Sequence, residues 1–252
     1  MRGVKAATAS SAVVVIAALV FSAAPAHAQR GRGAGAAPET ARVAAAIDLT
    51  GTWVSVISED WPQRMLPPRK GEYTRIPMTP AARKIADTWD PARDEAAGEQ
   101  CRGYTVAGIT RMPGRLRISW QDDYTMKMEL EAGSQTRLLH FRPGPPPAEA
   151  TWQGHSAAQW MYTRQPPRSG ELRVITNRIR PGYLRRNGVP LSGNASVTEY
   201  YHRFTAPNGD VWLTVVTEVT DPENLQVPYV QSSHFKKLPD GAPFKPEPCS
   251  TR

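Results

Sequence analysis

The chain has 252 residues, of which 40% are hydrophobic and 21% charged, enough for the core of one large domain or two small ones. Its 24 prolines, about twice the usual frequency, exclude a bundle of long helices and favour many short elements joined by stiff loops. The formal net charge is +8, but no segment combines a basic helix face with interleaved aromatic residues. We therefore expect no nucleic-acid partner.

The first segment, residues 1–28, has the pattern of a secretory signal peptide. Arg2 and Lys5 precede an apolar run over 12–21, and the small-residue exit A-H-A follows at 26–28. The apolar run is shorter than the about 20 residues that a transmembrane helix needs. We expect cleavage after this exit and an exported protein, periplasmic or extracellular, with no membrane span after cleavage. An uncleaved membrane anchor is the alternative.

The beginning of the mature chain predicts a leader followed by a single domain. Residues 29–46 are rich in Gly, Ala and Arg, without apolar periodicity, and are expected to form a flexible leader. The domain is expected over residues 47–252. β-branched and aromatic residues predict a strand over 50–57, and residues 60–68 resemble a short irregular strand that ends in prolines.

One short helix is predicted early in the domain. Thr79 is a favourable N-cap, and Pro80 suits the first helical position. Apolar residues then recur at i, i+3, i+4 and i+7, forming one stripe. The stripe consists of Ala82, Ile85, Ala86 and Trp89. The helix should end before Pro91, because a residue that precedes proline avoids the helical conformation.

From residue 104 onward the apolar period changes to two, which is typical of half-buried strands. Strands are expected over 115–120, 124–130, 135–141, 151–162, 171–180, 196–205, 211–220 and 228–237. The inward set of the first hairpin is Leu116, Ile118, Trp120, Tyr124, Met126, Met128 and Leu130. The pattern predicts an all-β, antiparallel up-and-down barrel of about 8–10 strands with one short early helix, since closure removes exposed edges. A two-sheet β-sandwich is the alternative.

The cysteines and histidines of the chain are the candidates for a disulfide and for a metal site. Cys101 and Cys249 form an even pair, which in an exported protein predicts a disulfide. A thiol nucleophile or a metal pair is the alternative, but no Cys/His spacing typical of a zinc site occurs. Four histidines lie on predicted strands, namely His140, His155, His202 and His234. We expect no metal and no cofactor.

The opening of the first strand resembles a known family. Gly51-Thr52-Trp53, after Asp48-Leu49, resembles the G-x-W start of lipocalin-like (calycin) proteins. The resemblance implies a barrel with the tryptophan packed across its closed end. The helix lies early rather than after the last strand, and no T-D-x motif lies on a middle loop.

A longer resemblance covers residues 48–249. The runs D-L-T-G-T-W, A-D-T-W-D-P and M-P-G-R-L-R-I-S-W are similar to a family of uncharacterised exported bacterial proteins. This resemblance implies export and supplies no mechanism.

The preferred function is binding of a small, partly apolar molecule in the barrel interior. Small barrels have room for one small ligand, and large apolar faces with a few polar groups are typical of pockets. The candidate ligand-binding residues are Trp61, Arg64, Trp120, Tyr124, Met126, Met128, Trp152 and Trp160. The first two lie in a loop expected near one barrel end. Ordinary core packing of the tryptophans is the alternative.

A barrel enzyme of the hydrolase or isomerase type is the second hypothesis. Glu199 and Tyr201 are in phase on one strand, and an inward carboxylate needs a partner such as Arg178 or Arg180. His202 adjoins them. No recognisable catalytic motif such as G-x-S-x-G occurs, so a non-enzyme is favoured. A structural or partner-binding envelope protein is the third hypothesis.

Overall fold

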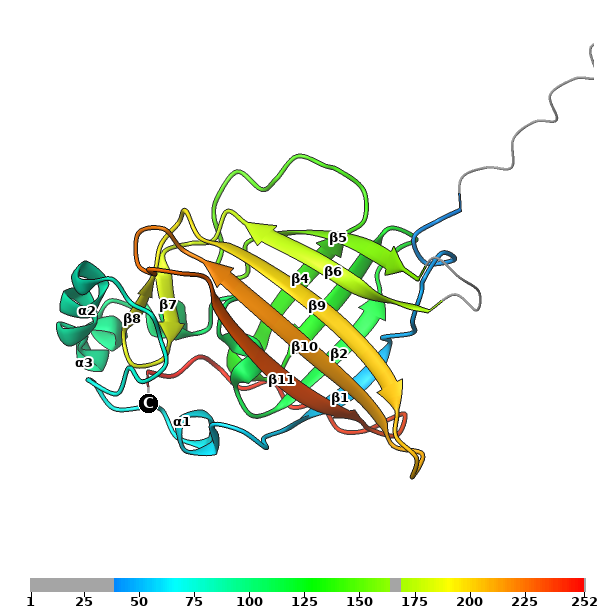
Figure 1. Cartoon of the computed structure of the whole chain (residues 1–252), viewed down its shortest axis with the longest axis horizontal. Coiled ribbons are helices and arrows are strands. Elements are labelled where there is room, and N and C mark those ends of the chain that lie inside the picture. Colours follow the sequence, from blue (N-terminus) through cyan, green and yellow to red (C-terminus); the bar gives the residue numbers. More distant parts are fainter. Residues whose placement is uncertain (1–38, 164–168, 252) are drawn as a thin grey trace, which may run out of the picture. The chain divides into compact units, whose positions relative to one another are not determined.

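The computed structural model describes residues 39–163 and 169–251 (Figure 1). The predicted signal peptide and residues 29–38 of the predicted leader lie outside this part of the chain. The regular elements of the described residues are mostly β-strands, with three short α-helices.

The elements follow one another in a nearly all-β order. The strands are β1 (Gly51–Val56), β2 (Arg115–Trp120), β3 (Thr125–Leu130), β4 (Gln135–His140), β5 (His155–Tyr162), β6 (Gly170–Asn177), β7 (Gly182–Arg185), β8 (Val189–Leu191), β9 (Ser196–Thr205), β10 (Val211–Thr220) and β11 (Tyr229–Lys237). The α-helices are α1 (Trp61–Met65), α2 (Pro80–Asp87) and α3 (Pro91–Ala96). The 3₁₀ helices are η1 (Gln100–Gly103), η2 (Ile109–Arg111) and η3 (Ala132–Ser134).

Nine strands form a closed barrel in the order β1-β11-β10-β9-β6-β5-β4-β3-β2. The first strand closes it by pairing with both ends of the sheet: Trp53 lies opposite Lys237 of β11 and Leu116 of β2. The predicted all-β barrel is thus confirmed, and the two-sheet sandwich is excluded. The predicted strands match the barrel strands closely, and β3, β6 and β10 show the expected burial of every second residue.

One strand pair departs from the predicted antiparallel pattern. β4 and β5 are parallel, with Leu139 opposite Ser156 and His140 opposite Ala157. An odd number of alternating strands cannot close without one parallel pair. A parallel pair needs a crossover of about a dozen residues or more, and the proline-rich segment 141–154 provides it.

The barrel interior is a packed core, and a second core lies at one end. Trp53, Met128, Leu172 and Val215 of the first core are fully buried. The second core combines α2, the β7–β8 hairpin and neighbouring loops, which lie at the left of Figure 1. The hairpin was missed from the sequence because its strands are only four and three residues long.

The helical region corrects two expectations. Residues 60–68 contain helix α1 rather than an irregular strand. The predicted start of α2 is confirmed, since the Thr79 side chain accepts a hydrogen bond from the Ala82 backbone N–H at 3.1 Å. Ile85 was expected on the buried stripe but is 52% exposed, because α2 ends after two turns and buries only Ala82 and Ala86.

Residues 39–46 were expected within a flexible leader but pack on the barrel. The Trp160 indole N–H donates to the Ala41 carbonyl at 2.8 Å, and the Tyr162 hydroxyl donates to the Ala44 carbonyl. Ala45 and Ala46 contact the barrel core. A prediction from composition could not reveal these tertiary contacts.

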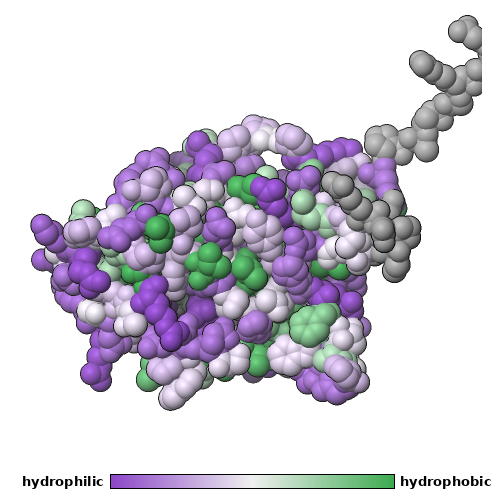
Figure 2. Space-filling view, viewed as in Figure 1, coloured by the Kyte–Doolittle hydropathy of each residue, from purple (hydrophilic) through white to green (hydrophobic). Residues whose placement is uncertain are grey.

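The predicted disulfide is confirmed: Cys101 of η1 is bonded to Cys249, 148 residues later. In the segments that the structure describes, no helix is long and apolar enough to cross a membrane. The face shown in Figure 2 is largely hydrophilic, and its hydrophobic residues form small separate groups.

Candidate functional site

A pocket lined by arginines lies beside α1, between η2, β7 and β11. Its cavity volume is about 60 Å³, room for a few waters at about 10–15 Å³ each. The lining residues, hereafter the arginine pocket, are Gln63, Arg64, Leu66, Pro67, Pro68, Gly103, Gly108, Arg111, Met112, Leu184, Arg185, Arg186 and Gln231. Among these residues are four arginines and no acidic side chain.

Arg64 is the most buried charge of the arginine pocket. Its side chain is 2% exposed although it belongs to the five-residue helix α1. Its Nε donates to the Arg111 carbonyl at 3.0 Å, and its Nη1 donates to Glu59 at 3.2 Å. Its Nη2 is buried and has no hydrogen-bond partner within the described segments. A buried donor without an acceptor is uncommon and needs an explanation.

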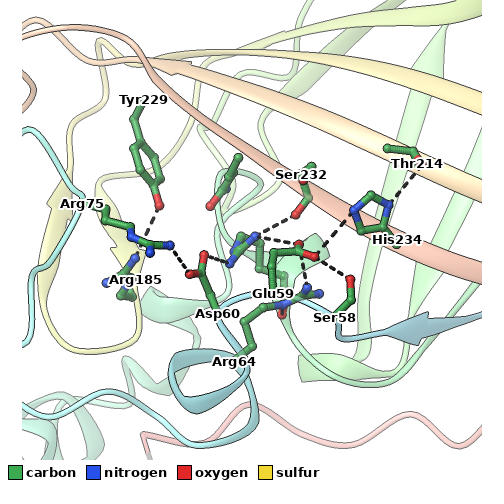
Figure 3. A network of polar contacts seen from close by, with 12 residues as sticks. Ser58, Glu59, Asp60, Arg64, Arg75, Arg185, Thr214, Tyr229, Ser232 and His234 are labelled. Atoms are coloured by element: carbon green, nitrogen blue, oxygen red, sulfur yellow. Dashed lines mark hydrogen bonds and ion pairs between the residues drawn. The ribbon is translucent and has the colours of Figure 1, made fainter.

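Arg111 ties the pocket to the barrel and to α1. Its Nη1 donates to the Ser232 carbonyl of β11 at 2.7 Å, and its Nη2 donates to Asp60 at 2.9 Å. Asp60 also accepts a bond from Arg75 at 2.7 Å (Figure 3). Asp60 has a positive φ of 51°, which turns the chain into α1 and brings the carboxylate towards both arginines.

The charges around Arg64 leave an excess of cations. Burial, and then the nearby charge of Arg111, lower the pKa of the Arg64 guanidinium to about 10, whereas Glu59 and Asp60 oppose that shift. Arg64 therefore remains charged at neutral pH. Because the two carboxylates are already bonded to arginines, an added anion would be favoured here.

Two glycines give the pocket its shape. A Cβ on Gly108 would lie 2.7 Å from the Leu184 carbonyl oxygen, and one on Gly103 would lie 2.9 Å from Cγ of Arg186. A side chain at Gly108 would push β7 away from η2, and one at Gly103 would displace Arg186, the residue after β7. The glycines therefore allow the close approach that forms one wall of the pocket.

A histidine lies at the outer side of the same network. His234 Nε2 is 3.6 Å from Glu59, and its Nδ1 is 3.2 Å from the Thr214 hydroxyl (Figure 3). Ser58 donates to the same carboxylate oxygen at 2.8 Å. These contacts hold Glu59 in place beside Arg64.

A second polar cluster lies inside the barrel. Arg137 of β4 donates to Glu199 of β9 through both terminal nitrogens, at 3.1 and 2.5 Å, and both side chains are 0% exposed. Burial alone would lower the pKa of Arg137, but the negative charge of the Glu199 carboxylate raises it above its ordinary value. Burial and Glu199 raise the pKa of the Tyr201 hydroxyl. Tyr201 therefore stays protonated inside the barrel.

The predicted catalytic candidates are not all brought together. Glu199 and Tyr201 point inward, but Arg137 pairs with Glu199 instead of the predicted Arg178 or Arg180. Arg180 is bonded to Glu99 at 2.6 Å outside the barrel. His202 points outward, since neighbours on a strand face opposite sides, and its Nδ1 lies 3.0 Å from Glu171.

The predicted ligand-binding residues fall into separate places. The ring centroids of Trp120 and Trp160 are 6.5 Å apart, and both rings contact Phe141. Phe141 was not among the predicted ligand-binding residues. Met126 and Met128 are 1% and 0% exposed inside the barrel.

The remaining candidates lie away from that aromatic group. Tyr124 stacks under Arg142, and Trp152 stacks under Arg180. Trp61 is 64% exposed on α1, close in sequence to Arg64 of the arginine pocket. Binding by these residues stays a prediction.

The histidines do not form a metal site in the described part of the chain. His140 and His155 stack at 5.1 Å between ring centroids, and burial together with His155 lowers the pKa of His140. No group of three or more His, Cys, Asp or Glu residues in the described ranges is arranged to hold a metal ion.

Comparisons of the chain with protein-family models, with curated proteins and with solved structures found no match.

Proposed function

We propose that this protein binds a small anionic molecule in the arginine pocket at one end of its β-barrel. One observation carries the proposal: Arg64 is a charged group 2% exposed, lines the pocket, and has an unpartnered buried Nη2. An unmet buried donor costs about 1–3 kcal/mol, and more when it is charged. An anion would supply the missing acceptor through a charge-assisted hydrogen bond.

The close packing of the barrel interior favours the arginine pocket over the interior as the binding site. Met126 and Met128 are in contact with the packed core and leave no open surface between them. A ligand there would have to displace core side chains, which costs free energy in a close-packed interior. The arginine pocket already contains open space.

We also propose that the protein acts after export. The segment 1–28 has the signal-peptide pattern. The disulfide between Cys101 and Cys249 supports this, because disulfides persist in oxidising compartments.

The binding proposal is tested by titration of ¹⁵N-labelled protein with sodium acetate, and separately with phosphate, at constant ionic strength. We expect saturable amide shifts at Gly108 and Leu184. Arg64→Gln should weaken binding by about 10- to 100-fold, the value of a charged hydrogen bond.

Two further variants control this test. The Arg93 side chain is 82% exposed, pairs with Asp90 and does not line the pocket, so Arg93→Gln should leave binding unchanged. Arg185 lines the pocket from β7, and Arg185→Gln should weaken binding even if Arg64→Gln fails to fold. The absence of saturable shifts, or equal affinities in all folded variants, would refute the proposal.

A further inference from the structure

Helix α1 has an inverted distribution of polar and apolar residues. It buries its charged residue, Arg64, and exposes Trp61 and Met65 by 64% and 55%. Leu66, directly after the helix, is 70% exposed. A surface helix normally buries its apolar face and exposes its charges. Helix α1 shows the opposite arrangement, and a buried charge beside exposed large apolar side chains indicates a binding surface.

The exposed residues adjoin the arginine pocket through Leu66. Trp61 and Met65 are spaced i, i+4 and share one side of α1. Leu66 belongs to both the exposed surface and the pocket lining. We name Trp61, Met65 and Leu66 the exposed apolar face.

We propose that the ligand is a single-chain anionic amphiphile, whose head group binds Arg64 and whose hydrocarbon chain lies on the exposed apolar face. This inference depends on the proposed function and names its ligand class. The cavity of about 60 Å³ holds a head group and excludes a long chain. The apolar part of such a ligand must therefore lie outside the pocket, where α1 offers apolar contact.

The recessed position of the cations argues for a monomeric ligand rather than a membrane surface. Anionic membranes attract exposed lysines and arginines at their surface. Arg64 and Arg111 have side chains only 2% and 12% exposed, so a flat array of head groups would not reach them. A single carboxylate is small enough to enter the arginine pocket, which Arg64 and Arg111 line.

The test compares the affinities of acetate, octanoate and dodecanoate at constant ionic strength, by calorimetry and tryptophan fluorescence. The two longer carboxylates are kept below their critical micelle concentrations. We expect affinity to rise about two- to fourfold for each methylene that contacts the exposed apolar face. Trp61→Ala should weaken dodecanoate binding about tenfold or more and leave acetate binding unchanged. Arg64→Gln should weaken both.

A matched variant and four further results complete the test. Ile85 is 52% exposed on α2 and lines no part of the pocket, so Ile85→Ala should have no effect. Equal affinity for acetate and dodecanoate would overturn the amphiphile proposal and leave anion binding intact. Dodecanol binding as tightly as dodecanoate, or binding only to phosphatidylglycerol vesicles, would also overturn it. Failure of every anion to depend on Arg64 would instead refute the proposed function.

Discussion

At the scale of single residues, the ion pair inside the barrel is the most exacting contact of the fold. Arg137 and Glu199 are both fully buried, and the guanidinium also lies 3.4 Å from the Ser156 and Thr176 hydroxyls. Burying a charge is tolerated only when it is paired and hydrogen-bonded. This network therefore specifies how β4, β5, β6 and β9 are arranged around the interior.

Neutralising the carboxylate should destabilise the protein strongly. Glu199→Gln leaves the Arg137 charge buried without an opposite charge, and we expect the free energy of unfolding to fall by about 3–5 kcal/mol. Urea unfolding followed by tryptophan fluorescence measures the change. Glu171 of β6 pairs with His202 outside the barrel and is 26% exposed, so Glu171→Gln should change stability by less than about 1 kcal/mol.

The double variant Arg137→Met/Glu199→Leu separates charge from packing. Apolar side chains of similar volume can replace a buried ion pair with little net loss. We expect this variant to recover part of the stability that Glu199→Gln loses. Equal destabilisation by Glu199→Gln and Glu171→Gln would contradict this account of the network.

The sequence predicted part of this network and missed the rest for a geometric reason. The alternating pattern indicated that Glu199 and Tyr201 share a face and need a partner. The predicted partners lay on the preceding stretch of sequence, whereas Arg137 reaches Glu199 from β4, three strands around the barrel. Contacts across a closed barrel depend on strand register and closure, which a single sequence does not reveal.

At the scale of elements, strands were predictable and α1 was not. Strand periodicity extends over six to ten residues, as in β2 and β9, so it gives a strong signal. Helix α1 has five residues, too few for a period. Its only local signal was Pro62 near the helix start, of the kind that correctly predicted α2 at Pro80. The arginine pocket went unrecognised as a unit because α1, η2 and β7 form it together.

The N-terminal segment 39–46 behaves as part of the barrel, which gives an element-scale prediction. A chain that begins at Ile47 loses the contact of Ala41 with Trp160 and the packing of Ala45 and Ala46. We expect its tryptophan fluorescence to be quenched more strongly by acrylamide than that of a chain beginning at Glu39. The urea midpoint should also fall, because apolar surface becomes exposed. Identical quenching in the two chains would show that the segment is not required to cover Trp160.

At the scale of the whole molecule, the disulfide stabilises the folded protein but is not needed to position the C-terminal segment. The tail near Cys249 is held by other contacts: the backbone N–H of Lys245 and that of Glu247 both donate to Glu131, at 2.7 and 2.8 Å. The backbone N–H of Ser250 donates to the Tyr104 hydroxyl at 3.0 Å. These bonds do not depend on the sulfur–sulfur bond.

Removing the disulfide should therefore act mainly on the unfolded chain. The bond between Cys101 and Cys249 closes a loop with a sequence separation of 148 residues. The chain-entropy model assigns such a loop about 4–5 kcal/mol. We expect Cys101→Ser/Cys249→Ser to lower the urea midpoint by a corresponding amount. The amide spectrum of the folded variant should stay nearly unchanged at Glu247, and anion binding at Arg64 should persist. Loss of the tail contacts in the folded variant would mean that the disulfide, rather than Glu131, fixes the C-terminal segment. Because the tail runs from Glu131 to η1, beside Gly103 of the arginine pocket, that result would also make the pocket sensitive to reduction.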